Sequence, residues 1–174
     1  MLKKILIAVA VLIVGFLVLV AFQPPTYRVS RSAVIPAAPA AVFPLVNDFH
    51  RWGAWSPWAS LDPNMKLTYG GPAEGAGATY AWVGNSQAGQ GQMTILESRP
   101  NELVRIKLEF IKPFASVAAT EFTFRPEGSG TAVEWTMSGD HNFFSKAMCL
   151  FVGMDKMVGP DFEKGLAQMK AAAR

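Results

Sequence analysis

The alternation of apolar and charged residues between positions 104 and 137 restricts the fold more than any other feature of the sequence. In residues 104–110 apolar side chains take turns with charged ones: Val104, Ile106, Leu108 and Phe110 against Arg105, Lys107 and Glu109. The same alternation returns in residues 120–125 and 133–137. Because successive side chains of a strand point to opposite faces, each segment predicts a strand with one dry face and one wet face.

Four segments upstream also have the composition of strands. They are bounded by turn residues and cover residues 27–35, 66–69, 78–83 and 92–98. Between the first two, Pro39 stands where a helix commonly begins, and Val42, Phe43 and Val46 follow at helical spacing. We therefore expect a short helix there, followed at residues 50–62 by a loop or broken helical turns.

The last thirty residues change to the period of a helix. Apolar residues recur every three or four positions, at Met148, Phe151, Met154, Val158, Phe162, Leu166 and Met169. Gly159 and Pro160 interrupt this pattern, which predicts a kink or two successive helices. A long meander of one-faced strands must bury its apolar face, and the final helix is long enough to cover it. The sequence thus predicts an α+β fold, with a curved antiparallel sheet and the C-terminal helix across its concave face.

Residues 5–22 form an uninterrupted apolar run ahead of this domain. Fourteen of these eighteen residues are Leu, Ile, Val or Phe. As a helix they would span about 27 Å, close to the hydrocarbon thickness of a bilayer, and their insertion is favoured by about 4–8 kcal/mol. We expect residues 1–22 to be a transmembrane anchor, residues 23–26 a short linker and residues 27–174 the folded domain.

A cleaved signal peptide is the alternative for the N-terminal segment. Its apolar region is normally shorter and ends at a small-x-small site, whereas the candidate here, residues 19–21, begins with Leu19. Lys3 and Lys4 precede the run, and positive residues favour the cytoplasmic side. The expected arrangement is a single-pass membrane protein whose folded domain lies on the non-cytoplasmic side.

The charge balance argues against a nucleic-acid partner. Without Lys3 and Lys4 the chain has 14 basic and 13 acidic residues, and it contains no run of Lys and Arg that would follow a phosphate backbone. Cys149 is the single cysteine, so no internal disulfide can form. Its apolar surroundings in the sequence favour a buried structural thiol.

Few polar residues are placed for catalysis. Asp140, His141 and His50 are the weak candidates, because a desolvated carboxylate or imidazole can act as a proton shuttle. Asp48 lies near His50 and Asp140 beside His141, but neither pair has helical ligand spacing or an obvious third ligand. We expect no metal site and no cofactor.

Aromatic residues and methionines are abundant for a core of this size. Aromatic walls with few polar groups suit an apolar ligand, and methionine adapts to an irregular guest. Ordinary core packing is the alternative for each single residue. With the tryptophans at positions 52, 55 and 58 and the turn at residues 70–77 as its entrance, we expect an internal cavity lined by Trp52, Trp55, Trp58, Tyr80, Trp82, Ile106, Leu108, Phe110, Phe122, Trp135, Met137, Met154 and Phe162.

Three segments resemble a known superfamily. Val-Ile-Pro-Ala-Ala-Pro at residues 34–39, followed by Val42-Phe43, and Trp-Gly-Ala-Trp-Ser-Pro-Trp at residues 52–58 are similar to the SRPBCC superfamily, also called START-like or Bet v 1-like. Residues 162–170 resemble the end of its polyketide cyclase/dehydrase branch. The resemblance implies a helix-grip fold with a deep cavity between the sheet and the C-terminal helix. It also implies binding or transport of lipids and other apolar molecules, and it carries over no catalytic residue.

Three functions remain open from the sequence. The favoured interpretation is a membrane-anchored, non-enzymatic binder of a hydrophobic small molecule or lipid. The first alternative is a cyclase- or dehydratase-type enzyme acting on a polyketide-like substrate. The second is an interaction module whose cavity is filled by its own side chains.

Overall fold

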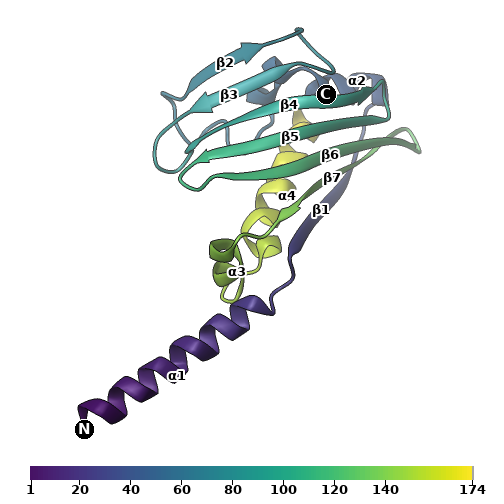
Figure 1. Ribbon diagram of the computed structural model, residues 1–174. Helices are drawn as coiled ribbons and strands as arrows, with labels where there is room; N and C mark the ends of the chain where they lie inside the picture. Colours follow the sequence, from purple (N-terminus) through teal and green to yellow (C-terminus); the bar gives the residue numbers. More distant parts are fainter. Residues whose placement is uncertain (174) are drawn as a thin grey trace.

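The computed structural model describes residues 1–173. A long N-terminal helix leads into a seven-stranded antiparallel sheet that curves around a C-terminal helix (Figure 1). The elements in chain order are α1 (Leu2–Ala21), β1 (Thr26–Ile35), α2 (Pro39–Asn47), the 3-10 helix η1 (Phe49–Ala54), β2 (Lys66–Gly70), β3 (Thr79–Val83), β4 (Gln90–Arg99), β5 (Leu103–Lys112), β6 (Ser116–Glu127), β7 (Gly130–Asp140), α3 (Phe143–Cys149) and α4 (Met154–Ala172).

The sheet has the strand order β1-β7-β6-β5-β4-β3-β2, so the first strand closes against the last one. β1 pairs with β7 along its whole length, from Thr26 opposite Asp140 to Ile35 opposite Thr131. In β5 the apolar side of the alternating segment faces the core, where Val104 and Ile106 are fully buried. The α+β fold predicted from the alternation, with a helix on the concave face of a curved sheet, is confirmed.

α4 lies across the concave face and contacts β1 and η1. It runs through Gly159 and Pro160 without a break, so the two C-terminal helices are not separated there but at residues 150–153. A kink at Gly159 and Pro160 stays a prediction. Pro160 removes one backbone hydrogen bond near the start of the helix. Ion pairs from Arg31 of β1 to Asp155 and Glu163, each with an N···O distance of 2.7 Å, tie the helix to the sheet on both sides of that position.

The segment expected to be a loop or broken helical turns begins with η1. The side chain of Asp48 accepts a hydrogen bond from the backbone N–H of His50 at 2.9 Å, which satisfies a free donor at the start of this short helix. η1 folds back on α2, with which it makes contacts. This return brings the tryptophans of residues 52–58 over the concave face of the sheet.

α1 projects away from the rest of the molecule (Figure 1). Among the residues that the structure describes, it is the one helix long and apolar enough to cross a membrane. Its side chains are exposed except for Val20, near the point where α1 contacts α3. Next to this point, the backbone N–H of His141 donates to the carbonyl oxygen of Pro25 at 2.7 Å. The end of α1 and the start of α3 are thus held close together.

Candidate ligand-binding site

The sheet and α4 meet directly at the centre of the concave face. The ring of Trp135 on β7 stacks on Phe162 of α4, with centroids 4.0 Å apart, and on Phe122 of β6 at 4.9 Å. Gly165 permits this approach, because a Cβ at that position would lie 2.7 Å from the Trp135 ring. The centre of the interface is therefore filled by aromatic side chains.

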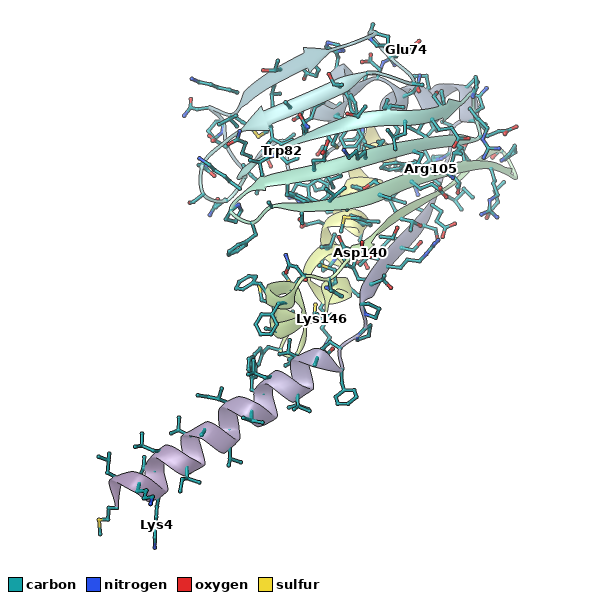
Figure 2. The ribbon with its side chains drawn as sticks, viewed as in Figure 1. Lys4, Glu74, Trp82, Arg105, Asp140 and Lys146 are labelled. Carbon is teal, nitrogen blue, oxygen red and sulfur yellow. The ribbon has the colours of Figure 1, made fainter. Side chains whose placement is uncertain are left out.

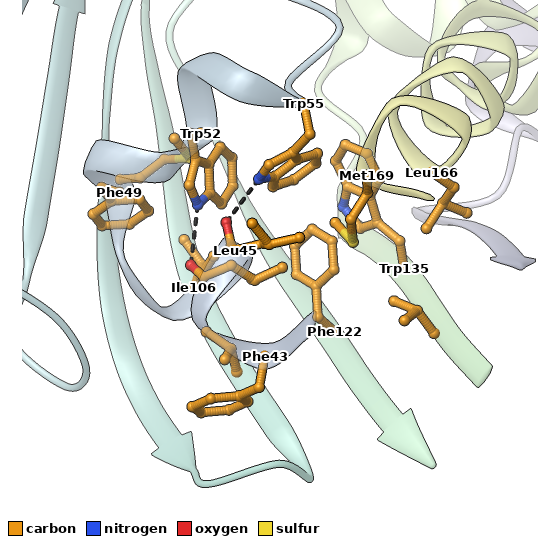
Figure 3. Close-up of a cluster of buried hydrophobic side chains, with 14 of the residues drawn as sticks. Phe43, Leu45, Phe49, Trp52, Trp55, Ile106, Phe122, Trp135, Leu166 and Met169 are labelled. Carbon is orange, nitrogen blue, oxygen red and sulfur yellow. Dashed lines mark hydrogen bonds between the residues drawn. The ribbon is translucent and has the colours of Figure 1, made fainter. Parts of the chain in front are cut away.

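Trp52 and Trp55 belong to this filled region (Figure 3). They are 5% and 1% exposed, so the expectation that they form a cavity entrance is wrong. Their indole N–H groups donate to Val46 O at 3.0 Å and Leu45 O at 2.7 Å, which are carbonyls of the last turn of α2. The last carbonyls of a helix have no partner within it. These two tryptophans thus cap α2 and fix it on the sheet.

The concave face ends near α3, where β7 leads into that helix, and we call this part the α3 end. Here the residues paired across neighbouring strands include Gly91 with Phe110 and Ala118 with Gly139. Leu108 and Phe110 keep partial exposure although they pack against the core. The space beside the glycines is occupied by rings, because a Cβ at Gly139 would lie 2.8 Å from Tyr27 and one at Gly91 would overlap Trp82. Leu108 and Phe110 are therefore the partly open side chains of the α3 end.

The residues expected to contact a ligand divide into two groups. Those buried in the core are Trp52, Trp55, Trp82, Ile106, Phe122, Trp135, Met137 and Phe162. Those that pack against the core but remain partly exposed are Trp58, Tyr80, Leu108, Phe110 and Met154. All of them lie in or against one hydrophobic core cluster. That they contact a ligand stays a prediction.

Three polar side-chain atoms are buried without a partner among the described residues. They are the hydroxyl oxygen of Thr120 on β6, the indole nitrogen of Trp135 on β7 and the amide oxygen of Gln168 on α4. Register places Thr120 opposite Met137, two residues along β7 from Trp135, so both side chains lie on the concave face. An unsatisfied buried polar group costs about 1–3 kcal/mol. A bound molecule that offers an oxygen acceptor would recover this cost.

Two hollows open on the surface of the described chain, away from the aromatic centre. One, of about 430 Å³, lies between β1 and α4 and is lined by Ser32, Ala33, Val34, Glu163, Leu166, Ala167 and Lys170. The other, of about 220 Å³, lies at the turn between β2 and β3.

His50 lines the smaller hollow. Its ring stacks on Tyr69 at 4.1 Å, and its Nδ1 atom lies 2.9 Å from Asp48 Oδ1. Burial raises the pKa of Tyr69, with Asp48 as a second cause, and raises that of the neighbouring Tyr80 to about 12. Both phenols therefore stay protonated at neutral pH. The hollow is too small for a lipid chain and suits a water or a small polar group.

A polar cluster that the sequence reasoning did not assemble lies where β7 leads into α3. His141 Nδ1 is 3.1 Å from Ser145 Oγ, and His141 Nε2 is 4.0 Å from Cys149 Sγ. The Tyr27 ring lies 5.0 Å from the imidazole. Burial lowers the pKa of His141, with Lys146 as a second cause, so the imidazole is neutral at pH 7. The four-residue spacing of His141, Ser145 and Cys149 is the signal that would have predicted the cluster, because the helical period expected for the last thirty residues already covers Ser145 and Cys149.

His50 and His141 belong to different ends of the molecule, and Asp140 is exposed to solvent. The three weak catalytic candidates therefore do not form one active site. Within residues 1–173, no group of three or more His, Cys, Asp and Glu residues is arranged to hold a metal ion.

The geometry, a curved antiparallel sheet closed around a C-terminal helix, defines a helix-grip protein. The sequence matches the family described as "Polyketide cyclase / dehydrase and lipid transport" over residues 26–174, and the chain belongs to that family. A search of curated proteins found no match.

Solved structures support the fold assignment. Protein MLL2253 from Mesorhizobium loti superposes with a TM-score of 0.61 at 18% identity, covering 85% of this chain and 99% of its own. Ara h 8.0201, with a TM-score of 0.55 at 10% identity, covers 85% and 94%. The Aha1 dimer from Colwellia psychrerythraea, with a TM-score of 0.54 at 16% identity, covers 84% and 92%. These proteins share the fold with this chain at low sequence identity.

Proposed function

We propose that the protein is a membrane-anchored binding protein for a hydrophobic small molecule or lipid, held between the sheet and α4 at the α3 end. The observation that carries this proposal is that two of the three unpartnered buried polar atoms, Thr120 Oγ1 and Trp135 Nε1, lie on the concave face of the sheet. The indole N–H can only donate a hydrogen bond. The guest is therefore an amphiphile with an apolar body and an oxygen acceptor, such as a carbonyl, ester or carboxyl group.

The anchoring part of the proposal rests on α1. Its 20 residues give a length of about 30 Å, which matches the hydrocarbon core of a bilayer. Val20 is fully buried near the contact with α3, which supports an anchor whose end packs against the folded domain. Lys3 and Lys4 at its start favour the cytoplasm. The folded domain, which follows α1 after a four-residue linker, would then lie on the non-cytoplasmic side.

The aromatic centre limits where a guest can lie. Trp135, Phe162 and Phe122 are stacked in direct contact, and opening this stack would expose large apolar rings at a cost of about 1.5–3 kcal/mol for each side chain. At the α3 end a guest would instead meet Leu108 and Phe110, which are already partly exposed. We therefore place the guest's apolar body at the α3 end, with its polar group directed toward Thr120.

The test is native mass spectrometry of the full chain purified from membranes in a mild detergent. A copurified amphiphile is expected with the wild type. Ala118→Leu fills the α3 end from the concave face and should abolish it, whereas Ala119→Leu adds the same group to the neighbouring exposed residue and should keep it. If the wild type carries no guest, or if both variants retain it equally, the proposal is wrong. An absent guest would favour the interaction module with a filled interior.

One observation favours a cyclase- or dehydratase-type enzyme as the second candidate. The His141 imidazole is neutral and lies beside Tyr27 and Cys149, close to the α3 end of the concave face. Such a group can remove a proton from a bound substrate. The two functions are distinguished by comparing the molecules that copurify with the wild type and with His141→Asn. A binding protein holds the same molecule in both, while a dehydratase would hold molecules that differ by one water.

A further inference from the structure

The surface beside the end of α1 is formed by large apolar side chains that nothing in the described chain covers. We call it the α3 surface, and its residues, each 40–80% exposed, are Phe114, Phe143, Phe144, Met148, Phe151 and Val152. They come from three separate elements: the turn between β5 and β6, α3, and the connection from α3 to α4. Contiguous exposed apolar residues of this kind are typical of an interaction surface.

The α3 surface is continuous. The rings of Phe114 and Phe144 lie 4.4 Å apart, so the β5–β6 turn and α3 are in contact although 30 positions separate the two residues in the chain. Four of the six residues of the α3 surface are phenylalanines, whose rings are 46–80% exposed. A partner must cover this surface if its apolar area is to leave water.

The position of the α3 surface identifies the partner. α3 contacts α1, and the His141 N–H donates to the Pro25 carbonyl between α1 and β1. Figure 2 shows Lys146 of α3 close to the end of α1. If α1 crosses a bilayer, its last turn lies at the level of the headgroups. The α3 surface then lies at that level too.

The residues of the α3 surface suit this location. Aromatic rings collect at the boundary between acyl chains and headgroups, where an apolar face can be buried without losing contact with water. Lys112 stands two residues before Phe114, and Lys146 lies within α3. Their positive charges can pair with anionic headgroups. A second protein would have to compete with a bilayer that α1 already holds against this surface.

We propose that the α3 surface inserts into the interfacial layer of the bilayer that α1 crosses, an inference that rests on the anchoring proposed above. The α3 end of the concave face adjoins this surface. The proposed guest site is thus on the side of the domain that faces lipid.

The experiment uses the full chain reconstituted in vesicles that contain an anionic lipid and a brominated lipid, which quenches tryptophan at short range. Phe151→Trp places a reporter on the most exposed residue of the α3 surface, and its emission is obtained by subtracting that of the wild type. The matched control is Leu96→Trp, on an exposed residue of β4 at the other end of the sheet. Phe143→Trp reports on the same surface from within α3, in case the substitution at residue 151 impairs folding.

The added emission of Phe151→Trp and Phe143→Trp is expected to shift to shorter wavelength and to be quenched, and that of Leu96→Trp to be unaffected. If the chain stays with the vesicles after alkaline extraction but neither reporter is quenched, the surface does not touch lipid and the inference fails while the anchoring stands. If the chain is released by alkaline extraction, the anchoring fails and the inference with it.

Discussion

The guanidinium group of Arg31 lies directly against Gly159, in the turn of α4 between Asp155 and Glu163. The three helical residues are four positions apart and therefore share one face of α4. Arg31 Nη1 and Nη2 donate to the two carboxylate oxygens of Asp155 at 2.7 and 3.0 Å, and Nε donates to Glu163 at 2.7 Å. Arg31 thus attaches α4 to the edge strand β1, and the absence of a side chain at Gly159 leaves the space that the guanidinium group occupies.

Gly159→Ala should not bring the gain of about 0.5–1 kcal/mol that Ala normally has over Gly within a helix, because the new methyl group overlaps the Arg31 guanidinium and displaces it from Asp155 and Glu163. Chemical denaturation followed by circular dichroism measures the change. Gly53→Ala is the matched control, since a Cβ at that exposed position meets no atom of the chain. A gain in stability of that size for Gly159→Ala would contradict the close approach.

The ion pairs of Arg31 should make stability depend on pH in the acid range. Hydrogen bonding to Arg31 lowers the pKa of Asp155 below its usual range. A carboxylate with a lower pKa in the folded state stabilises the fold above the pKa of the unfolded chain, about 3.9, and this contribution is lost as the pH falls through the folded value. The wild type should therefore lose stability more steeply below about pH 4 than Asp155→Asn.

The matched control for this pH dependence is Asp161→Asn, on the same helix, because Asp161 has no ion pair with the described residues. Its stability should follow the steep wild-type curve. The role assigned to Arg31 is wrong if Asp155→Asn and Asp161→Asn give parallel curves.

Trp55→Phe should cost about 1–3 kcal/mol of stability, because it leaves the buried carbonyl of Leu45 without its donor. Trp58→Phe makes the same chemical change at a partly exposed ring whose indole makes no hydrogen bond with the described residues, and it should cost clearly less. Thermal unfolding of the two variants, side by side, measures the difference. Similar melting temperatures would show that the cap on α2 is unimportant.

Thr120→Val should affect stability and binding in opposite directions. The substitution replaces an unpartnered buried hydroxyl by a methyl group of similar size, so the guest-free protein should gain up to about 1–3 kcal/mol. The same change removes the group proposed to meet the guest's polar end, so less amphiphile should copurify. Melting temperature after delipidation and native mass spectrometry give the two readouts. The control is Thr123→Val. Thr123 lies three residues further along β6, partly exposed on the opposite face of the sheet, and its substitution should alter neither readout.

The strands were predictable because the sheet has one wet face. In β5 and β6 the polarity of each side chain indicates which face of the sheet it lies on. Arg105 and Glu121 form an ion pair on the outer face, while Ile106 and Phe122 are buried. The signal weakens where the strand leaves the core. β6 therefore begins at Ser116, four residues before the predicted start, in a region where small exposed residues carry no alternation.

The start of α3 could not be predicted in the same way, because the apolar residues of this helix do not lie on one buried face. Phe143, Phe144 and Met148 are all exposed, and no residue of α3 is buried. Its start is marked by Asn142, whose side chain accepts from the Ser145 N–H at 2.8 Å. That capping residue is a weaker signal in the sequence than the longer pattern downstream.

The filled centre of the interface also lay beyond sequence reasoning. Composition shows that many aromatic residues face the interior, but not whether their rings stack or stand apart. Gly165 decides the outcome, since it brings α4 within reach of Trp135. Which turn of a helix comes closest to the sheet follows from the three-dimensional path of the chain rather than from local preference.

The connection between α1 and β1 sets a limit on how such a protein would operate. Four residues separate the two elements and can span at most about 14 Å, and one of them is hydrogen-bonded to His141. If α1 anchors the chain as proposed, a domain with so short a linker cannot carry a ligand across an aqueous compartment to a distant membrane. Delivery would then depend on the recipient coming to it, by lateral encounter in the same bilayer or by the approach of a soluble acceptor.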